Sequence, residues 1–263
     1  MISVIIVVYK SKKNLLKKFI KNLDKKNNLI IINNSKNYDF SKIKLPKKTK
    51  IIKSSNRGYG AALNLGLKHC KTKYAIISNI DVIFKKNFIS DFLLIAKKIK
   101  KFAILIPNHK NNNYQDELVE NYDGEGATML INVKKINKLK FDENFFLYYE
   151  ETDLFFKCKK NNYKVFIINN LKIKNKRSSS ISYKNNNLQF FMKWHFMWSM
   201  FYFYRKNYNF LYALKKTYLL ICKDLIKLIF YMLTFDKISF KVRFYRLHGI
   251  ACSIIGLKAY KRP

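Results

Sequence analysis

The chain has 263 residues and carries 53 Lys and Arg against 16 Asp and Glu, which gives a net charge of +37. Its hydrophobic share of 49%, with only seven glycines and three prolines, excludes a disordered chain and a Pro/Gly-rich linker. The charge favours a nucleic-acid partner, but only six of the basic residues are Arg, the residue that nucleic-acid sites prefer. We therefore expect affinity for anions in general, such as nucleotides and phospholipid head groups.

The first hundred residues alternate β-branched runs with segments of helical spacing. The runs lack in/out alternation, as expected for strands buried on both faces of a parallel sheet. The predicted strands are 2–8, 29–32, 50–52, 74–78 and 102–106, and the predicted helical segments are 14–23, 58–69 and 88–99. This alternation predicts a doubly wound α/β domain. A polar loop follows residue 108, and further strands are predicted at 127–133 and 164–168.

Beyond about residue 187 the chain is aromatic, basic and helical in pattern. Residues 154–263 hold 23 basic and 2 acidic side chains. The apolar run 218–235 contains three charges, too many for a membrane span, whereas Lys216, Lys223 and Lys227 share one helical face. This predicts an amphipathic helix at a membrane surface, with Trp194 and Trp198 as interfacial anchors. The alternative is a helical lid on the α/β domain.

Acidic side chains gather in one part of this basic chain. Ten of the sixteen acids fall between residues 116 and 153, and Glu150, Glu151 and Asp153 lie within four positions. Carboxylates this close repel one another, and they persist where a metal, a proton or a polar substrate needs them. The alternative is a helix N-terminus, where acids favour the helix dipole.

Two further segments have features of a ligand site. Asn79 and Asp81 follow the strand predicted at 74–78, and open α/β sheets bind ligands at the carboxyl ends of their strands. Asp81 is therefore a candidate ligand for Mg²⁺ or Mn²⁺, with a helix cap as the alternative. The segment 56–66 opens a helix whose first N–H groups suit an anion, although it lacks the P-loop and GxGxxG spacings.

Together these segments resemble glycosyltransferase family 2, in particular its rhamnosyltransferase-like branch of bacterial surface-polysaccharide enzymes. The resemblance covers about residues 2–182 and rests on five matches in the right order. They are VIIVVYKS at 4–11, NRGYGAALNLGL at 56–67, SNIDV at 78–82, GATMLI at 126–131 and FDENFFLYYEETDLFFKCKK at 141–160. Residues 198–206 also resemble the C-terminal extension of that branch.

The resemblance implies a GT-A type fold with a Rossmann-like, mostly parallel sheet and a C-terminal amphipathic helical extension. The catalytic domain is expected at 1–186, with a nucleotide-sugar-binding half at 1–108 and an acceptor-binding half at 109–186, and the extension at 187–263. The implied activity is an inverting, metal-dependent sugar transfer in surface polysaccharide or lipopolysaccharide synthesis.

The same resemblance assigns roles to individual residues. Glu151 is the expected catalytic base and Asp81 the metal ligand. Gly126, Glu150 and Asp153 are expected to bind the acceptor, with a β-bulge as the alternative for Gly126 and a helix start for Asp153. The expected nucleotide-sugar-binding residues are Val8, Tyr9, Asn33, Asn56, Gly58, Asn64, Asn79 and Lys174.

Three positions depart from the family pattern. Asn33 replaces an acid that contacts the nucleotide base, Glu150-Glu151 replaces a Glu-Asp pair, and Lys174 stands near the place of a late histidine. An amide still bonds a pyrimidine edge. A lysine contacts phosphate but does not replace histidine as a metal ligand at neutral pH unless its pKa falls.

The expected partners are a nucleotide-diphosphate sugar, with dTDP-rhamnose favoured by the branch, and a saccharide or polyprenyl-linked acceptor. The scattered cysteines and the absence of a signal-peptide pattern predict a cytoplasmic protein. The amphipathic helix and the resemblance together imply that it is peripheral at the inner face of the bacterial cytoplasmic membrane. Three alternatives stay open at this stage: a catalytically degenerate family member, a basic nucleic-acid-binding protein and a membrane-surface scaffold.

Overall fold

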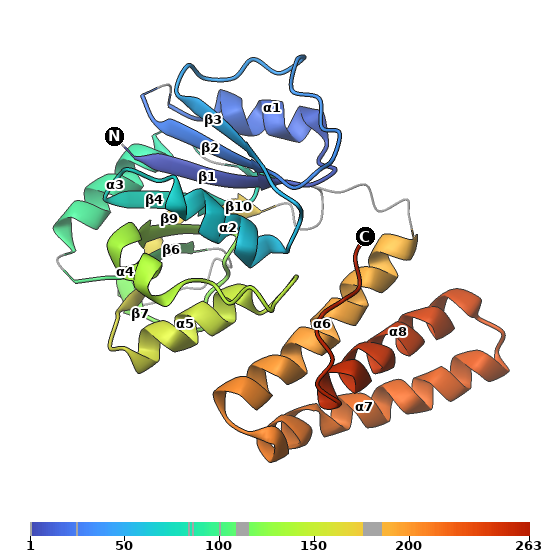
Figure 1. Ribbon diagram of the computed structural model, residues 1–263. Coiled ribbons are helices and arrows are strands. Elements are labelled where there is room, and N and C mark those ends of the chain that lie inside the picture. Colours follow the sequence, from blue (N-terminus) through green and yellow to red (C-terminus); the bar gives the residue numbers. More distant parts are fainter. Residues whose placement is uncertain are drawn as a thin grey trace. The chain divides into compact units, whose positions relative to one another are not determined.

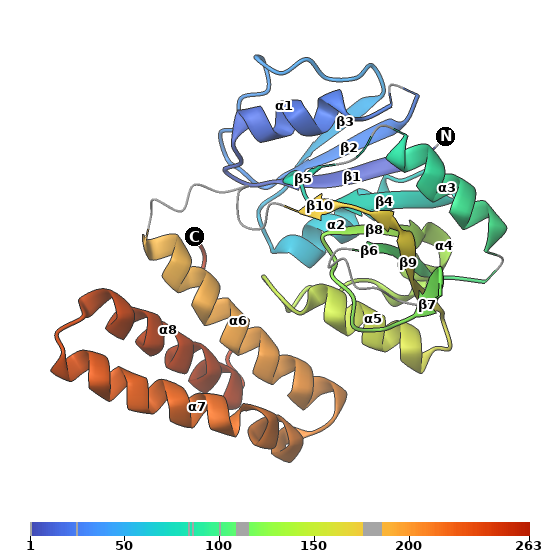
Figure 2. The same ribbon diagram turned by 180° about the vertical axis from the view of Figure 1, so that it is seen from behind.

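The computed structural model describes residues 2–24, 26–83, 85, 87–99, 101–108, 116–175 and 186–263, without the side chains of residues 174, 175 and 186. The chain divides into two compact units, drawn from opposite sides in Figures 1 and 2. The α/β unit comprises Met1–Asp142 and Glu151–Ser182. The helical unit comprises Glu143–Glu150 and Tyr183–Pro263.

The α/β unit is built on a mixed sheet in the order β3-β2-β1-β4-β8-β6-β9-β7. Its strands are β1 (Ser3–Val8), β2 (Asn28–Asn33), β3 (Thr49–Lys53), β4 (Tyr74–Ser78), β6 (Ile104–Asn108), β7 (Leu118–Glu120), β8 (Thr128–Asn132) and β9 (Val165–Lys172). Only β7 and β8 run against the common direction. The predicted doubly wound, mostly parallel sheet is therefore confirmed. A separate ladder pairs β5 (Val82–Ile83) with β10 (Lys174–Asn175).

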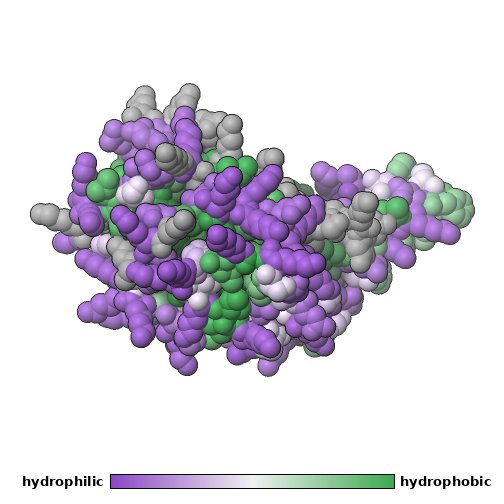
Figure 3. Space-filling view, turned by 90° about the horizontal axis from the view of Figure 1, so that it is seen from above, coloured by the Kyte–Doolittle hydropathy of each residue, from purple (hydrophilic) through white to green (hydrophobic). Residues whose placement is uncertain are grey.

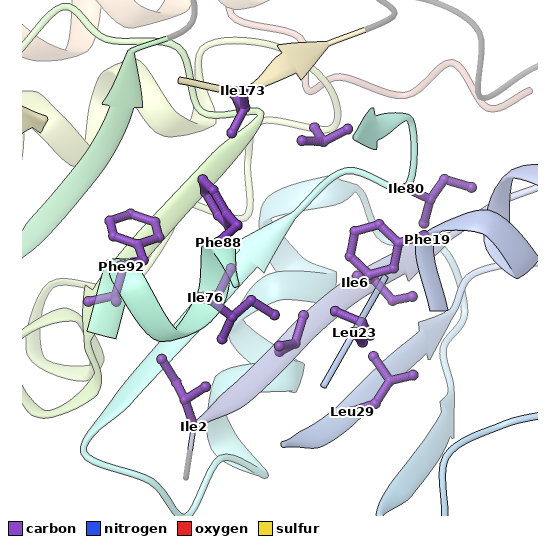
Figure 4. Packing of buried hydrophobic residues seen from close by; sticks show 14 of the residues in the cluster. Ile2, Ile6, Phe19, Leu23, Leu29, Ile76, Ile80, Phe88, Phe92 and Ile173 are labelled. Carbon is purple, nitrogen blue, oxygen red and sulfur yellow. The ribbon is translucent and has the colours of Figure 1, made fainter. Parts of the chain in front are cut away.

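Helices cover both faces of this sheet. On one face lie α1 (Lys13–Lys21) and α3 (Phe88–Lys98); on the other lie α2 (Tyr59–Lys68), α4 (Val133–Leu139) and α5 (Glu150–Lys160). In β1, Val4 and Ile6 pack toward the first pair while Ile5 packs toward the second set. Figure 4 shows Phe19 of α1 and Phe88 of α3 in the same cluster of buried side chains as Ile6 of β1. Because both faces are buried, the strands need continuous apolar runs.

The sequence pattern did not predict every element of the fold, and β7 and α4 are two examples. β7 lies within the stretch after residue 108 that was expected to be a polar loop, and α4 directly follows β8. β7 has three residues, Leu-Val-Glu, at the edge of the sheet, too few to show a period. α4 starts where the Asn132 side chain accepts a hydrogen bond from the Lys135 N–H, a cap within a run predicted as strand.

The helical unit contains α6 (Asn186–Asn207), α7 (Phe210–Leu233) and α8 (Lys237–Ile254), followed by a tail over residues 255–263. Trp194 and Trp198 of α6 are buried, at 0% and 3% exposure, so their predicted role as interfacial anchors is wrong. Each indole N–H has an internal acceptor, His248 Nδ1 at 3.0 Å for Trp194 and the Leu257 carbonyl at 2.9 Å for Trp198. A buried indole with its N–H bonded needs no interface.

Hydrophilic residues predominate on one face of the molecule. The face drawn in Figure 3 is mostly hydrophilic, in keeping with the excess of Lys over acids. No helix in the described part of the chain is sufficiently long and apolar to pass through a bilayer.

The helical unit also buries one ion cluster. Asp224 of α7 is 1% exposed and accepts hydrogen bonds from Arg243 Nη1 at 2.9 Å and Arg246 Nε at 2.6 Å, both on α8. Two guanidinium groups offset the cost of burying this carboxylate.

We expect Asp224→Ala to lower the free energy of unfolding of the helical unit by about 3 kcal/mol, because it leaves two arginines without their counter-charge. Asp236→Ala removes an exposed N-cap of α8 and should cost about 1 kcal/mol. Both tryptophans lie in α6, so urea titration followed by tryptophan fluorescence reports this unit. Equal losses for the two variants would contradict the expectation.

Candidate active site

The loops that follow β1, β2 and β3 meet at one edge of the sheet. The Asn34 N–H donates to the Val8 carbonyl and the Ser54 N–H donates to the Asn33 carbonyl, both at 2.9 Å. The Lys10 N–H donates to Ser35 Oγ at 2.7 Å. These bonds join three strand ends, the place where open α/β sheets bind ligands. They bring together Val8, Tyr9, Asn33 and Asn56 from the predicted site.

Asn34 at this edge was missed by the sequence reasoning. Its Nδ2 donates to Asn56 Oδ1 at 3.2 Å, its side chain is buried, and its Oδ1 has no hydrogen-bond partner among the described residues. The neighbouring Asn33 uses Oδ1 to accept the Ser35 N–H at 3.0 Å and so closes the turn. The only signal in the sequence was the Asn-Asn pair that ends β2.

The start of α2 depends on backbone conformations that suit particular residues. Gly58, at the helix N-cap, has φ +118°, and Asn56 has φ +51°. Glycine adopts positive φ without a Cβ clash, and Asn tolerates it better than most residues. Next to Gly58, the Tyr59 hydroxyl donates to Asn79 Oδ1 at 2.7 Å. That bond ties the beginning of α2 to the loop after β4.

Asn64 holds a distant backbone segment. Its Nδ2 donates to the Phe141 carbonyl and its Oδ1 accepts the Phe141 N–H, both at 2.9 Å. These two bonds fasten α2 to the beginning of the acidic segment. A contact from Asn64 to a nucleotide sugar stays a prediction.

Asp81 lies three residues beyond β4 and is 6% exposed. The β5–β10 ladder sets Asn175 opposite Val82 and Lys174 opposite Ile83, so the backbone of Lys174 comes close to the Asp81 segment. In the described ranges there is no group of three or more His, Cys, Asp or Glu side chains that could hold a metal. A carboxylate oxygen at a strand end nevertheless fits Mg²⁺ or Mn²⁺, which complete their shells with phosphate oxygens and water.

Glu151 packs against Gly126. A Cβ on residue 126 would lie 2.8 Å from Glu151 Cγ and 2.9 Å from Glu151 Cβ, so this glycine is required for space. The adjacent Ala127 carbonyl accepts the Asn79 N–H at 2.8 Å, which extends the pairing of β4 with β8. The segments that carry Asp81 and Glu151, seventy positions apart, are thus linked through β8.

The acids do lie at a helix N-terminus. α5 begins at Glu150, and Lys157, Lys159 and Lys160 lie in its last turn. Asp153 is inside the helix, fully buried, and pairs with Lys157 at 3.0 Å, so it does not start the helix. Glu150 is also buried. The dipole of α5 and the Asp153–Lys157 ion pair explain why some of these acids lie here. They do not explain the close contact of Glu151 with Gly126.

The environment of Glu151 favours its protonated form. Burial raises the pKa of the Glu151 carboxyl above its ordinary value, and the nearby charge of Glu125 raises this pKa further. A hydrogen bond with a backbone group lowers the pKa of Glu151, but this effect is smaller than that of burial. A carboxylate with a raised pKa is a better proton acceptor near neutral pH.

A comparison with known protein families shows the family to which this chain belongs. Residues 3–210 match the family described as "Glycosyl transferase family 2". The chain belongs to glycosyl transferase family 2. No curated protein sequence matches it.

Solved structures of glycosyltransferases share its fold. PcManGT, a mannosyltransferase from Pyrobaculum calidifontis in complex with GDP-Man and Mn²⁺, aligns with TM-score 0.58 at 9% identity over 96% of this chain and 86% of its own. Residues 1–349 of S. aureus TarS align with TM-score 0.54 at 13% identity over 99% and 93%.

GalNAc-T7, solved with UDP, GalNAc and Mn²⁺, aligns with TM-score 0.59 at 10% identity over 78% of this chain. The family 2 chain described here spans about half of GalNAc-T7, since 48% of that chain is covered. These likenesses confirm the predicted GT-A type α/β fold.

Replacing Glu125 tests the electrostatics of the site. We expect Glu125→Gln to lower the pKa of Glu151, because a neighbouring negative charge opposes ionisation of a carboxyl. ¹³C NMR titration of the glutamate carboxyls, assigned with Glu151→Gln, measures this pKa. Glu120→Gln is the control, since Glu120 pairs with Lys164 at 2.6 Å and does not act on Glu151. An unchanged Glu151 titration in Glu125→Gln would refute the coupling.

Proposed function

We propose that this chain is an inverting, metal-dependent glycosyltransferase. It moves a sugar, with rhamnose the favoured candidate, from a nucleotide-diphosphate donor to a hydroxyl of a saccharide or lipid-linked acceptor in surface polysaccharide synthesis. The choice of rhamnose rests on the resemblance of residues 78–82 and 141–160 to one branch of the family. The Mn²⁺ in two solved relatives supports a divalent cation.

One observation carries the proposal. The Asn79–Ala127 hydrogen bond and the Gly126–Glu151 contact link the segment of a candidate metal ligand to that of a carboxylate with raised pKa. Sugar transfer needs two such groups with different tasks, one that holds the donor diphosphate and one that accepts a proton. A carboxylate whose environment raises its pKa suits the second task.

The donor diphosphate belongs at the carboxyl edge of the sheet. Asp81 would hold a divalent cation there, and the bound cation offsets the negative charge that develops on the leaving diphosphate. The remaining predicted donor contacts are Val8, Tyr9, Asn33, Asn56, Gly58, Asn64, Asn79 and Lys174, to which the buried amide of Asn34 is added. The N-terminus of α2, after Gly58, presents backbone N–H groups suited to an anion.

Glu151 takes the proton of the acceptor hydroxyl. The acceptor oxygen forms a bond to the anomeric carbon from the face opposite the donor diphosphate, and the bond from that carbon to the diphosphate oxygen breaks. The diphosphate leaves with the electron pair, so the configuration inverts. Gly126, Glu150 and Asp153 are the remaining candidates for the acceptor side, where the missing Cβ of Gly126 lets the Glu151 side chain pack against the backbone of residue 126.

We expect Glu151→Gln to lose at least about 10²-fold in turnover while donor binding is retained, because general-base help is worth roughly 10²–10⁴-fold. The raised pKa means that the folded state binds this proton more tightly than the unfolded state, so stability from this group falls as pH rises through that pKa. Gln removes that penalty, and thermal melting at pH 7 should occur at an equal or higher temperature. Weakened donor binding with normal turnover would contradict the assignment.

Asp81→Asn tests the donor side separately. We expect nucleotide-diphosphate sugars to raise the melting temperature of the parent chain only with Mg²⁺ or Mn²⁺, and Asp81→Asn to abolish that increase. A panel of donors measured in this way identifies the sugar and the base. An increase that persists in Asp81→Asn, or that needs no cation, would reject Asp81 as the metal ligand.

We also propose that α7 binds an anionic membrane surface, which places the enzyme peripherally at the cytoplasmic membrane where lipid-linked acceptors reside. Ala213, Thr217 and Asp224 form the buried side of α7. Leu219, Ile226 and Leu233, seven residues apart, are 76%, 70% and 69% exposed. An exposed apolar stripe of this length is unusual on a soluble surface.

The positive charge beside the apolar stripe of α7 favours an anionic membrane as its partner. Lys216, Lys223 and Lys227 share one side of α7, and the second half of the chain is strongly basic. Two copies of α7 would bring like charges together, whereas anionic lipid head groups complement them.

We expect Leu219→Asn with Ile226→Asn to weaken binding to phosphatidylglycerol vesicles at least tenfold, since burying one Leu or Ile contributes about 1.5–3 kcal/mol. Leu94→Asn on α3, an exposed leucine of the α/β unit, is the matched control. Vesicle co-sedimentation measures binding. If the parent chain binds neutral phosphatidylcholine vesicles as strongly as phosphatidylglycerol vesicles, electrostatic attraction does not contribute to membrane binding and this part of the proposal is refuted.

A further inference from the structure

The segment just before Glu151 belongs to the helical unit. Residues 144–149, here called the strap, lie in the piece Glu143–Glu150 that groups with α6, α7 and α8, and Glu151 is the first residue after that piece. The chain therefore passes from one unit to the other at the peptide bond that precedes the proposed base.

Every residue of the strap contacts α6. Asn144 Nδ2 donates to the Tyr202 hydroxyl at 3.2 Å, and the Ser199 hydroxyl donates to the Leu147 carbonyl at 2.9 Å. The four aromatic strap residues have ring partners on α6 at centroid distances of 4.9–5.7 Å. The pairs are Phe145–Tyr202, Phe146–His195, Tyr148–Phe196 and Tyr149–Phe203.

The C-terminal tail holds the same strap from another direction. The Arg262 guanidinium lies over the Phe146 ring at 4.4 Å, and the Lys261 carbonyl lies 3.1 Å from His195 Nε2. Burial lowers the pKa of His195 to about 3, so this ring is neutral and offers Phe146 an uncharged face. Phe146 is thus held between α6 and the tail.

The strap is also conformationally demanding. Tyr148 and Tyr149 have φ +69° and +67°, two consecutive side-chain-bearing residues in the left-handed region. Such a conformation is strained for a residue with a side chain, and it persists only where the surroundings enforce it. The ring contacts of Tyr148 and Tyr149 with α6 hold these two residues in that conformation. The two tyrosines directly precede Glu150 and Glu151.

We propose that α6 and the C-terminal tail set the position of Glu151 through the strap, so that Ser199 and Tyr202 are positioning residues for the transfer step. This inference rests on the proposed function, in which Glu151 is the base. A buried hydroxyl that bonds a loop carbonyl stabilises one loop conformation, and a base displaced by about 1 Å can cost about 10²-fold in rate.

Ser199→Ala tests the proposal against a matched control. We expect it to lower turnover about tenfold, with donor affinity and the thermal midpoint close to those of the parent chain. Ser253→Ala makes the same change at a second fully buried serine, on α8, whose hydroxyl has no hydrogen-bond partner in the described part of the chain. It should leave turnover unchanged. Equal turnover in the two variants would overturn the proposal.

A double-mutant cycle shows whether the loss acts through Glu151. In the Glu151→Gln background, Ser199→Ala should cause no further loss, because residues that act as a unit are non-additive. A further tenfold loss in that background would overturn the proposal while leaving Glu151 as the base. Full turnover in Glu151→Gln alone would instead reject the proposed function.

Tyr202→Phe supplies an independent variant if Ser199→Ala fails to fold. It removes only the hydroxyl that accepts from Asn144, and Tyr202 is partly exposed, which reduces the risk to folding. A turnover loss with unchanged donor affinity, absent in the Glu151→Gln background, supports the positioning role. Parent-like turnover overturns it.

Discussion

The close contact between Gly126 and Glu151 is the constraint on which the site depends. Any Cβ at residue 126 would come within 2.8 Å of the Glu151 side chain. The next residue, Ala127, bonds the Asn79 backbone and so aligns the ends of β4 and β8. The Asn79–Ala127 hydrogen bond and the Gly126–Glu151 contact therefore connect the Asp81 loop to the first turn of α5, although these segments are distant in the chain.

The edge of the sheet supplies the rest of the candidate site. Backbone hydrogen bonds join the loops after β1, β2 and β3, and the Tyr59–Asn79 bond joins α2 to the loop after β4. Several polar side chains at this edge are engaged with the protein itself. Asn64 bonds the Phe141 backbone with both of its amide atoms. Such internal bonds hold the loops in place before a ligand arrives, which lowers the cost of ordering on binding.

The helical unit combines a well-packed interior with an exposed apolar stripe on α7. Both tryptophans and the Asp224 cluster are buried, whereas one side of α7 exposes leucine and isoleucine beside lysine. The strap gives this unit a second role under our proposals, since it ends at Tyr149, two residues before Glu151. Membrane contact and positioning of the base would then reside in one helical unit without sharing residues.

The sequence alone determined the fold class, because strands buried on both faces require continuous apolar runs that are visible without coordinates. It also located Asp81, Gly126 and Glu151 as candidates, since residue type and order are local properties. The buried tryptophans, Asn34 and the strap were decided only by the tertiary structure. Whether an indole faces lipid or a histidine, and whether a carbonyl meets Ser199, depends on partners about fifty positions away, and no local period records such pairings.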